Sequence, residues 1–319
     1  MQVEVKTVLV FITLFFTLSN LRGLLSQTKH DVQHLFGLDG HHGFGATMSC
    51  NRFRFLLARL SFDDKSERES KWKTDRFAPI REIFEAFNIN CAKYMSPEEY
   101  CALDETLYPT RIMISFKQYN PRKPAKYGLL FRSINAITFR YTYCVIVCAG
   151  KPENTEDARY YIPSVIESVK TLVNHLKKYQ ELSGRTISTD QLYTGFPLAE
   201  WLLTHNIMTV GTIQPNRVGI PAEIKEAKHR EQFSYEILWE KAHGDISVHS
   251  YVVNTKSKGK KNVLMLSSRP AQNGRVLVCK IVCTQACWQF LKKSLYLGSF
   301  RIFCPYWLNR HWSKTDCFD

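Results

Sequence analysis

The fold is decided by a β-rich stretch that carries two neighbouring acids. It reads Tyr100-Cys-Ala-Leu-Asp104-Glu105-Thr-Leu-Tyr108, and Pro109 ends it. Two more β-rich runs follow at residues 129–137 and 140–149, joined by a tight connection. These runs predict three successive strands, of which the first places Asp104 near its middle.

An alternation of helices and strands follows. Apolar residues recur at three- and four-residue steps over 162–176, which predicts an amphipathic helix. A strand is predicted over 185–190, ending in Asp190, then a helix over 197–204 and a strand over 207–213. The order β-β-β-α-β-α-β predicts an α/β fold built on a mixed sheet.

The part before residue 95 is predicted to be helical. Ser49 is a suitable N-cap, and Met48 is placed to staple the start of the helix. The apolar face of this helix is expected to consist of Phe53, Leu56, Leu57 and Leu60. Its basic face is expected to consist of Arg52, Arg54 and Arg59. A further amphipathic helix is predicted over 77–87.

Two stretches of the same part are predicted to lack regular structure. The glycines between residues 37 and 45 suggest a phosphate-binding loop, but no apolar strand precedes them, so a plain loop is favoured. The charged stretch 63–75 is predicted to be an exposed linker.

An apolar run at residues 8–18 allows two interpretations. It is too short to cross a bilayer, but it fits the apolar region of a signal peptide. No clear cleavage site follows it. A buried first helix is the favoured interpretation, and a signal or anchor is the alternative.

The charge of the chain predicts an anionic partner. The 319 residues include 43 Lys plus Arg and 29 Asp plus Glu, so the net charge is 43 − 29 = +14. Residues 246–319 alone hold 12 basic and 2 acidic residues, a net of 12 − 2 = +10. An apolar content of 45% excludes a disordered chain. The scattered cysteines form no Cys-x-x-Cys pair, which favours a reducing compartment.

Two carboxylates are candidate metal ligands because of their positions. Asp104 lies in the first strand and Asp190 ends the fourth, and sites in α/β sheets form at the carboxyl ends of strands. Adjacent acids there can share divalent metal, and the alternative is that each acid caps a turn. Glu105 is expected to point to the opposite face, which makes it the weaker candidate.

Three basic clusters are candidates for DNA binding. The first is the basic face of the helix that Ser49 caps, with Arg52, Arg54 and Arg59. The second interleaves cations with aromatics and prolines, as in a loop that follows a phosphate backbone and stacks on bases, although a solvated loop would look similar. Its cations are Lys117, Arg122, Lys123 and Lys126. The third is a basic, hairpin-like turn before a buried strand at 263–268, with Lys256, Lys258, Lys260 and Lys261.

Four ordered motifs resemble the piggyBac transposase family. They are Ala102-Leu-Asp-Glu-Thr-Leu-Tyr-Pro-Thr-Arg111, Phe116-Lys-Gln-Tyr-Asn-Pro-Arg-Lys-Pro-Ala-Lys-Tyr-Gly128, Ile187-Ser-Thr-Asp-Gln-Leu-Tyr-Thr-Gly-Phe-Pro-Leu-Ala-Glu200 and Val210-Gly-Thr-Ile-Gln-Pro-Asn-Arg-Val-Gly-Ile-Pro221. The resemblance covers about residues 5–268.

This resemblance implies an RNase H-like core that cuts and joins DNA with three aspartates holding two Mg²⁺ ions. Asp104 matches the first aspartate and Asp190 the second. The third belongs to a Gly-Gly-Val-Asp-like motif shortly after the strand that ends at Ser268, and nothing here matches it. We therefore expect a catalytically defective transposase-like protein. The alternative is a domesticated, non-catalytic DNA-binding or interaction protein.

The expected organisation has five parts. A helical dimerisation and DNA-binding-like region at 1–95 precedes the RNase H-like core at 96–220. A small β-rich insertion at 221–262, a returning strand at 263–270 and a diverged, poorly ordered basic tail at 271–319 follow. The expected partner is DNA, with a homodimer as a further option, and neither a small-molecule substrate nor a membrane is expected. The nucleus is the expected location, or the secretory pathway if residues 6–18 act as a signal.

Overall fold

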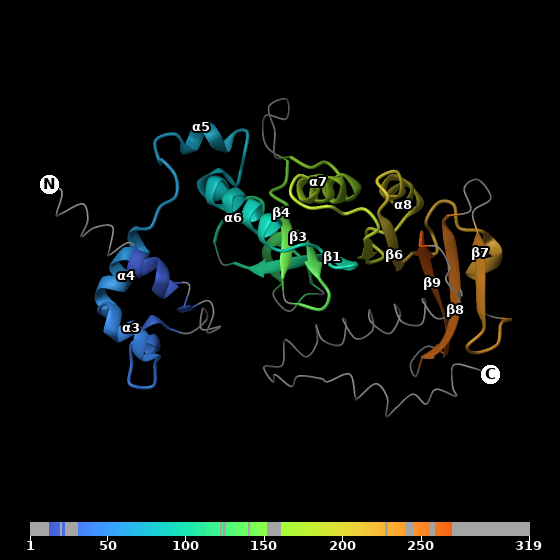
Figure 1. Cartoon of the computed structure of the whole chain (residues 1–319), viewed down its shortest axis with the longest axis horizontal. Coiled ribbons are helices and arrows are strands. Elements are labelled where there is room, and N and C mark those ends of the chain that lie inside the picture. The colour runs from blue at the N-terminus through green and yellow to red at the C-terminus, as the bar shows by residue number, and fades with distance from the viewer. Residues whose placement is uncertain are drawn as a thin grey trace. The chain divides into compact units, whose positions relative to one another are not determined.

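The computed structural model describes residues 13–19, 21–22, 31–110, 112–121, 123, 126–139, 141–151, 161–226, 229–239, 245–255 and 259–269. The predictions for Arg122, Lys256, Lys258 and the tail at 271–319 fall outside these residues. The described residues divide into two compact units, one formed by those up to Glu85 and the other by those from Ala86 onward. Figure 1 labels the elements of each.

The first unit is helical, as predicted. After a helix at residues 13–19 it contains α2 (Val32–Leu35), α3 (His42–Thr47), α4 (Cys50–Arg59), α5 (Arg68–Trp72), the 3₁₀ helix η1 (Ala78–Ile80) and the start of α6 (Arg81–Tyr94). Its core combines phenylalanines with aliphatic residues and includes Phe15, Leu35, Phe44 and Phe53. The described part of the first apolar run therefore forms a helix with Phe15 and Leu18 buried, whereas Phe16 is 40% exposed. None of the helices in the described ranges is long and apolar enough to span a membrane.

Helix α4 confirms the predicted cap and corrects the predicted apolar face. The Ser49 hydroxyl accepts a hydrogen bond from the Arg52 N–H at 3.3 Å, and Met48 is buried in the same core as Phe53. Leu57 and Leu60, by contrast, are 40% and 38% exposed. The core covers one narrow stripe of the helix, so only the residues on that stripe are buried.

Both stretches predicted to be irregular contain helices. Residues 42–47 form α3, whose start is capped by the His41 Nδ1 atom accepting from the Gly43 N–H at 3.1 Å. Complete burial of Phe44 offsets the low helix propensity of its two glycine neighbours. The prediction of a plain loop at 37–45 was wrong for this segment.

The charged stretch 63–75 ends in a buried ion pair. Asp75 receives two hydrogen bonds from the Arg81 guanidinium, at 2.7 and 2.8 Å, and a third from the Phe77 N–H. Because two matched N–H groups meet two carboxylate oxygens, the pair is satisfied despite its burial. The prediction of an exposed linker was therefore wrong at Asp75, which the sequence pattern did not separate from its solvated neighbours.

The second unit is built on one mixed sheet. Its strands are β1 (Tyr100–Pro109), β2 (Gln118–Tyr119), β3 (Tyr127–Ala136), β4 (Thr142–Val147), β5 (Thr186–Thr189), β6 (Met208–Thr212), β7 (Tyr235–Trp239), β8 (Ser247–Thr255) and β9 (Gly259–Ser267). The order is β2-β3-β1-β5-β6-β9-β8-β7, and β4 also pairs with β3. Strands β1, β5 and β6 are parallel, and the other pairings are antiparallel. The predicted strand and helix order is confirmed, with β2 as an addition.

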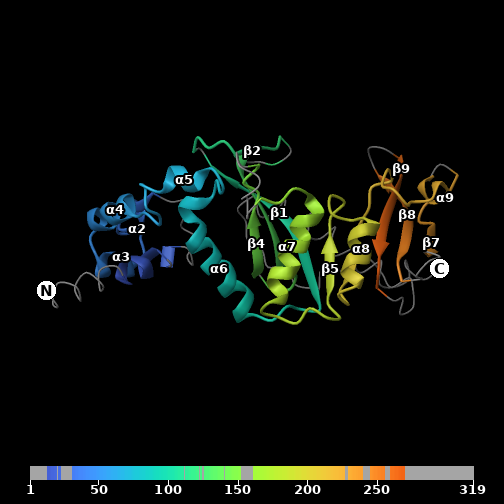
Figure 2. The same ribbon diagram turned by 90° about the horizontal axis from the view of Figure 1, so that it is seen from above.

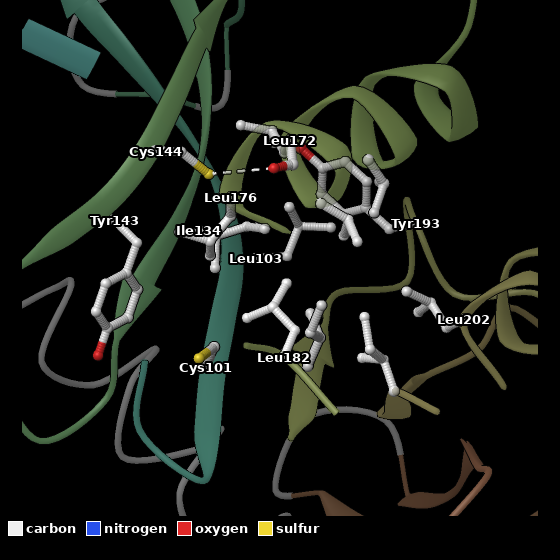
Figure 3. Close-up of a cluster of buried hydrophobic side chains, with 14 of the residues drawn as sticks. Cys101, Leu103, Ile134, Tyr143, Cys144, Leu172, Leu176, Leu182, Tyr193 and Leu202 are labelled. Atoms are coloured by element: carbon white, nitrogen blue, oxygen red, sulfur yellow. Dashed lines mark hydrogen bonds between the residues drawn. The ribbon is translucent and has the colours of Figure 1, made fainter. Parts of the chain in front are cut away.

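Two helices cover one face of this sheet. Helix α7 (Val165–Lys177) packs over β3 and β4, and α8 (Phe196–Leu203) packs beside β6 (Figure 1 and Figure 2). Figure 3 shows Leu172 and Leu176 of α7 against Leu103 and Ile134 of the sheet. This layer buries Cys101 and Leu103 of β1. Because successive strand side chains alternate, the even-numbered ones, Asp104 included, belong to the other face.

The segment after residue 221 continues the sheet. The short helix α9 (Ala222–Lys225) precedes β7, and β8 and β9 form a long antiparallel ladder that extends to the Thr255–Gly259 pair. Strand β9 therefore begins four residues before the predicted position 263. A second apolar cluster, which includes Ile224, Val248 and Leu266, joins this part to α8.

Arg269 ties the end of β9 back to the start of β1. Its guanidinium donates to Glu99 at 2.7 Å and to Thr186 at 3.0 Å, and it lies 4.7 Å from the centre of the Tyr100 ring. These contacts lie at the amino-terminal ends of β1 and β5, the edge of the sheet opposite to Asp104 and Asp190.

A buried histidine links the last three strands. The Ser247 hydroxyl donates to the Ser267 carbonyl, so the His249 Nε2–H donates to Ser247 at 2.8 Å. The Nδ1 atom then accepts from the Tyr235 hydroxyl at 2.5 Å. Burial lowers the pKa of His249 from 6.5 to about 4, because the charged imidazolium would lose its hydration.

This pKa predicts a loss of stability in mild acid. The unfolded chain takes up a proton at His249 near pH 6.5, whereas the folded chain does so only near pH 4. The contribution of neutral His249 to the free energy of unfolding is therefore complete above pH 6.5. It decreases as the pH falls toward 4, by about 3 kcal/mol in total. Urea unfolding from pH 7 to 4 measures it. The non-titrating variant His249→Gln should show a shallower decline, and equal declines would contradict the assignment.

Gly211 allows β5 and β6 to approach each other next to Asp190. A Cβ atom there would lie within 3 Å of the Thr189 carbonyl and of the Thr189 and Thr194 hydroxyls. Those hydroxyls are 2.8 Å apart, and Thr194 also donates to the Asp190 carbonyl at 2.9 Å. The close approach therefore holds the turn that carries Asp190.

Gly211→Ala is predicted to destabilise the protein by about 1–3 kcal/mol, because backbone and hydroxyls must move apart to admit the methyl group. Gly45→Ala is the matched control, since Gly45 lies in α3 with nothing within 4 Å of the added atom. We expect this control to be neutral or stabilising. Thermal unfolding compares the two, and equal effects would contradict the steric argument.

Candidate functional site

The two candidate acids occupy matching positions on neighbouring parallel strands. Strands β1 and β5 pair through Tyr100 with Thr186 and onward to Ala102 with Ser188. Asp104 and Asp190 each lie two residues beyond the last pair, and parallel neighbours are about 4.8 Å apart. The register therefore places both acids at the same level of the sheet, at the carboxyl end of β5.

The turn after β5 fixes Asp190. Its carboxylate accepts from its neighbour, the Gln191 N–H, at 2.7 Å and from the Thr212 hydroxyl at 3.4 Å. Arg217 holds the same turn from outside, donating to the carbonyls of Gln191 and Leu192 at 3.2 and 2.8 Å. Asp190 is exposed to solvent, whereas its backbone is held in place.

Asp104 is half-buried in the middle of β1. Its Oδ1 atom accepts from the Glu105 N–H at 2.8 Å, and the β3 residue opposite it is Ser133, which is buried. Glu105, on the other face, pairs with Lys123, whose ammonium lies 3.7 Å from the carboxylate and donates to the Glu105 carbonyl at 2.8 Å. Lys123 is thus in contact with β1 next to Asp104.

Two buried donors lie behind Glu105. The Tyr193 side chain is 3% exposed, and its hydroxyl has no hydrogen-bond partner in the described part of the chain. Burial and then the nearby Glu105 carboxylate raise the pKa of Tyr193. Arg132 donates to the Ser168 hydroxyl at 3.1 Å, while its Nε atom is buried without a partner among the described residues.

The donor set of the acids fits one hard cation. Mg²⁺ binds one or two carboxylates and fills its other positions with water or substrate phosphate, which Asp104 and Asp190 can support. No group of three or more His, Cys, Asp or Glu side chains within the described ranges is arranged to hold a metal ion. A two-ion site would need further ligands that these residues do not supply.

The second basic cluster forms an aromatic platform beside this end of the sheet. The rings of Tyr119 and Tyr127 lie with their centres 4.7 Å apart and their planes tilted by 36°, and both side chains are more than half exposed. The Lys117 ammonium lies 5.7 Å above the Tyr127 ring, and Lys126 is exposed. Two exposed rings with neighbouring cations are suited to stack on nucleic-acid bases.

The face of α4 places an aromatic side chain between two cations. Phe55 is 52% exposed, and the guanidinium groups of Arg52 and Arg59 lie 5.7 and 5.6 Å from its ring centre. Arg54 instead pairs with Asp31 at 3.3 Å. In the third cluster, Lys260 donates to the Arg230 carbonyl at 3.0 Å, and Lys261 is exposed.

Sequence reasoning missed the role of Arg217, which holds the turn of Asp190, and the two buried donors beside Glu105. Tyr193 and Arg217 lie within the motifs Ile187–Glu200 and Val210–Pro221, but the Arg217 contacts with the backbone and the burial of the Tyr193 hydroxyl arise only in the fold. Nothing in the sequence marks Arg132 as a functional residue, because a single arginine in a strand is common. Its register opposite Glu105 appears only once β1 and β3 are paired.

Several known proteins are similar to this chain. The sequence matches the family described as Transposase IS4 over residues 10–275. PiggyBac transposable element-derived protein 3 of Homo sapiens is 24% identical over 199 residues, which are 60% of this chain and 32% of that protein. The chimeric ERCC6-PGBD3 protein of Homo sapiens is also 24% identical over 199 residues, which are 18% of its length.

A solved structure shares the fold. The cryo-EM structure of a piggyBac transposase synaptic complex with hairpin DNA matches with a TM-score of 0.70 and 27% identity, over 82% of this chain and 52% of that chain. The chain thus spans about a third or less of the curated relatives it matches and about half of the solved chain. Since the family match covers most of the chain, the protein belongs to the Transposase IS4 family and, within it, to the piggyBac-derived proteins.

Proposed function

We propose that this protein is a DNA-binding, transposase-like protein with an RNase H-like core that does not complete DNA cleavage and strand transfer. The observation that carries the proposal is the register of Asp104 and Asp190 on β1 and β5. It supports a site for phosphodiester chemistry at the carboxyl ends of parallel strands. The mixed sheet, with both acids on its central strands, supports the RNase H-like assignment.

The ligand count supports the loss of activity. Mg²⁺ held by Asp104 and Asp190 would polarise a phosphate oxygen and lower the pKa of a bound water. The chain's own residues bind and orient: Arg217 fixes the turn of Asp190, and the Glu105 N–H fixes the carboxylate of Asp104. Two carboxylates suit a site for one metal ion. Cutting and joining DNA by the two-ion route needs a third carboxylate.

Two surfaces support DNA as the partner. One surface is the aromatic platform, on which bases can stack beside Lys117. The other is the face of α4, where Arg52 and Arg59 can bind phosphates on either side of Phe55. The net charge of +14 favours such a partner. The related solved complex contains hairpin DNA, which favours the same partner class. We propose the nucleus as the location and a homodimer as the assembly on the family resemblance.

A second candidate function uses these surfaces without metal. Neither the platform nor the α4 face includes a candidate acid, so both would work in a domesticated DNA-binding protein. The absence of a three-ligand group in the described ranges favours this alternative over an active enzyme. Metal dependence distinguishes the two, because binding through these surfaces alone is unchanged by EDTA.

DNA binding is predicted to weaken steeply with salt. Each phosphate contact contributes about −0.9 to the slope of log K against log salt, so Arg52→Met with Arg59→Met should reduce the slope by about 1.8. Arg54→Met is the matched control, because Asp31 already neutralises that side chain, and it should reduce the slope less. Fluorescence anisotropy with a short duplex measures the slopes. Binding that is unchanged by salt would rule out this use of the charge.

The protein is predicted to be inactive on transposon-end DNA. Incubation with such DNA and Mg²⁺ or Mn²⁺ should give neither hairpin formation nor strand transfer on a denaturing gel, because the second ion lacks ligands. Asp104→Asn and Asp190→Asn serve as controls that keep the shape of each side chain. Cleavage by the natural sequence that both substitutions abolish would show that another group supplies the third ligand.

A further inference from the structure

The backbone of Glu105 lies between an acid and a cation. Its N–H donates to the Asp104 carboxylate at 2.8 Å, and its carbonyl accepts from the Lys123 ammonium, also at 2.8 Å. The same ammonium lies 3.7 Å from the Glu105 carboxylate, and about a quarter of each side chain is exposed, 24% for Lys123 and 23% for Glu105. Lys123 therefore contacts the backbone that orients Asp104 while its charge remains accessible to solvent.

Glu105 has a second set of partners on its own face of the sheet. The antiparallel register places Arg132 directly opposite Glu105, so both side chains leave the sheet on the same side. The Nε atom of Arg132 and the hydroxyl of Tyr193 are buried donors without partners in the described part of the chain. A buried donor without an acceptor costs free energy, so this pair favours any acceptor that turns toward it.

We propose, on the basis of the proposed DNA binding, that Lys123 is a positioning residue with two alternative partners. In the free protein its ammonium pairs with Glu105. In the complex with DNA the Lys123 ammonium pairs with a phosphate of the nucleic acid. The Glu105 carboxylate then turns and accepts hydrogen bonds from Arg132 and Tyr193. The exchange keeps each charge paired, since phosphate neutralises the ammonium and guanidinium neutralises the carboxylate. DNA binding is thereby coupled to the backbone beside Asp104.

The first test is a double-mutant cycle on DNA affinity. Glu105→Gln removes the competing carboxylate and should tighten binding of a fluorescent duplex about fivefold at low salt. The same substitution in a Lys123→Met background should have no effect. Glu200→Gln, which removes one exposed negative charge from α8, is the matched control and should change the affinity less. Equal effects in both backgrounds, or an effect equal to that of the control, would overturn the proposal.

The second test needs no DNA. Tyr193→Phe removes a buried hydroxyl that has no acceptor, so the urea midpoint of the natural sequence should stay the same or rise. In the Lys123→Met background Glu105 accepts from that hydroxyl, and the substitution should lower the midpoint. A midpoint that does not fall in the Lys123→Met background would overturn the exchange itself. Failure of the natural protein to bind duplex DNA at any salt concentration would instead overturn the proposed function, and with it phosphate as the second partner.

Discussion

The parallel pairing of β1 with β5 is the constraint on which the rest of the second unit depends. It joins an antiparallel half made of β1, β3 and β4 to the later strands of the same sheet. Parallel neighbours require a crossover, which α7 provides, and α7 brings the leucines that fill the core. Because the register is set by this one pairing, the level of Asp104 relative to Asp190 follows directly from it.

The sequence alone was sufficient for elements whose pattern is local. The strand at 100–109, the helix at 165–177 and the Ser49 cap were predictable because alternation, helical spacing and capping are properties of short segments. The helix at 42–47 was missed, since its stability comes from burying Phe44 and not from propensity. For the candidate site, the sequence places Asp104 within one predicted strand and Asp190 at the end of another, whereas Arg132 and Tyr193 required the register and the packing.

The charged side chains show why net charge is a poor guide to a binding surface. Arg54, Lys123 and Lys260 belong to the clusters that the sequence assigns to DNA, yet each has a partner within the protein. Arg52 and Arg59 contact an exposed ring, and Lys117 lies over a tyrosine. Only the fold separates cations committed to internal contacts from those placed beside exposed aromatic rings.

The contacts of Arg269 have a consequence for how the sheet is assembled. Its ion pair with Glu99 joins residues 170 positions apart, and its guanidinium also binds the first residue of β5. Contacts between such distant residues slow folding, since a long loop must close before they form. During synthesis the amino-terminal ends of β1 and β5 remain without this clamp until Arg269 has left the ribosome. The contacts of Arg269 therefore form late in the assembly of the sheet. In a nascent chain that stops before β9, the edge of β6 is exposed and can associate with other chains.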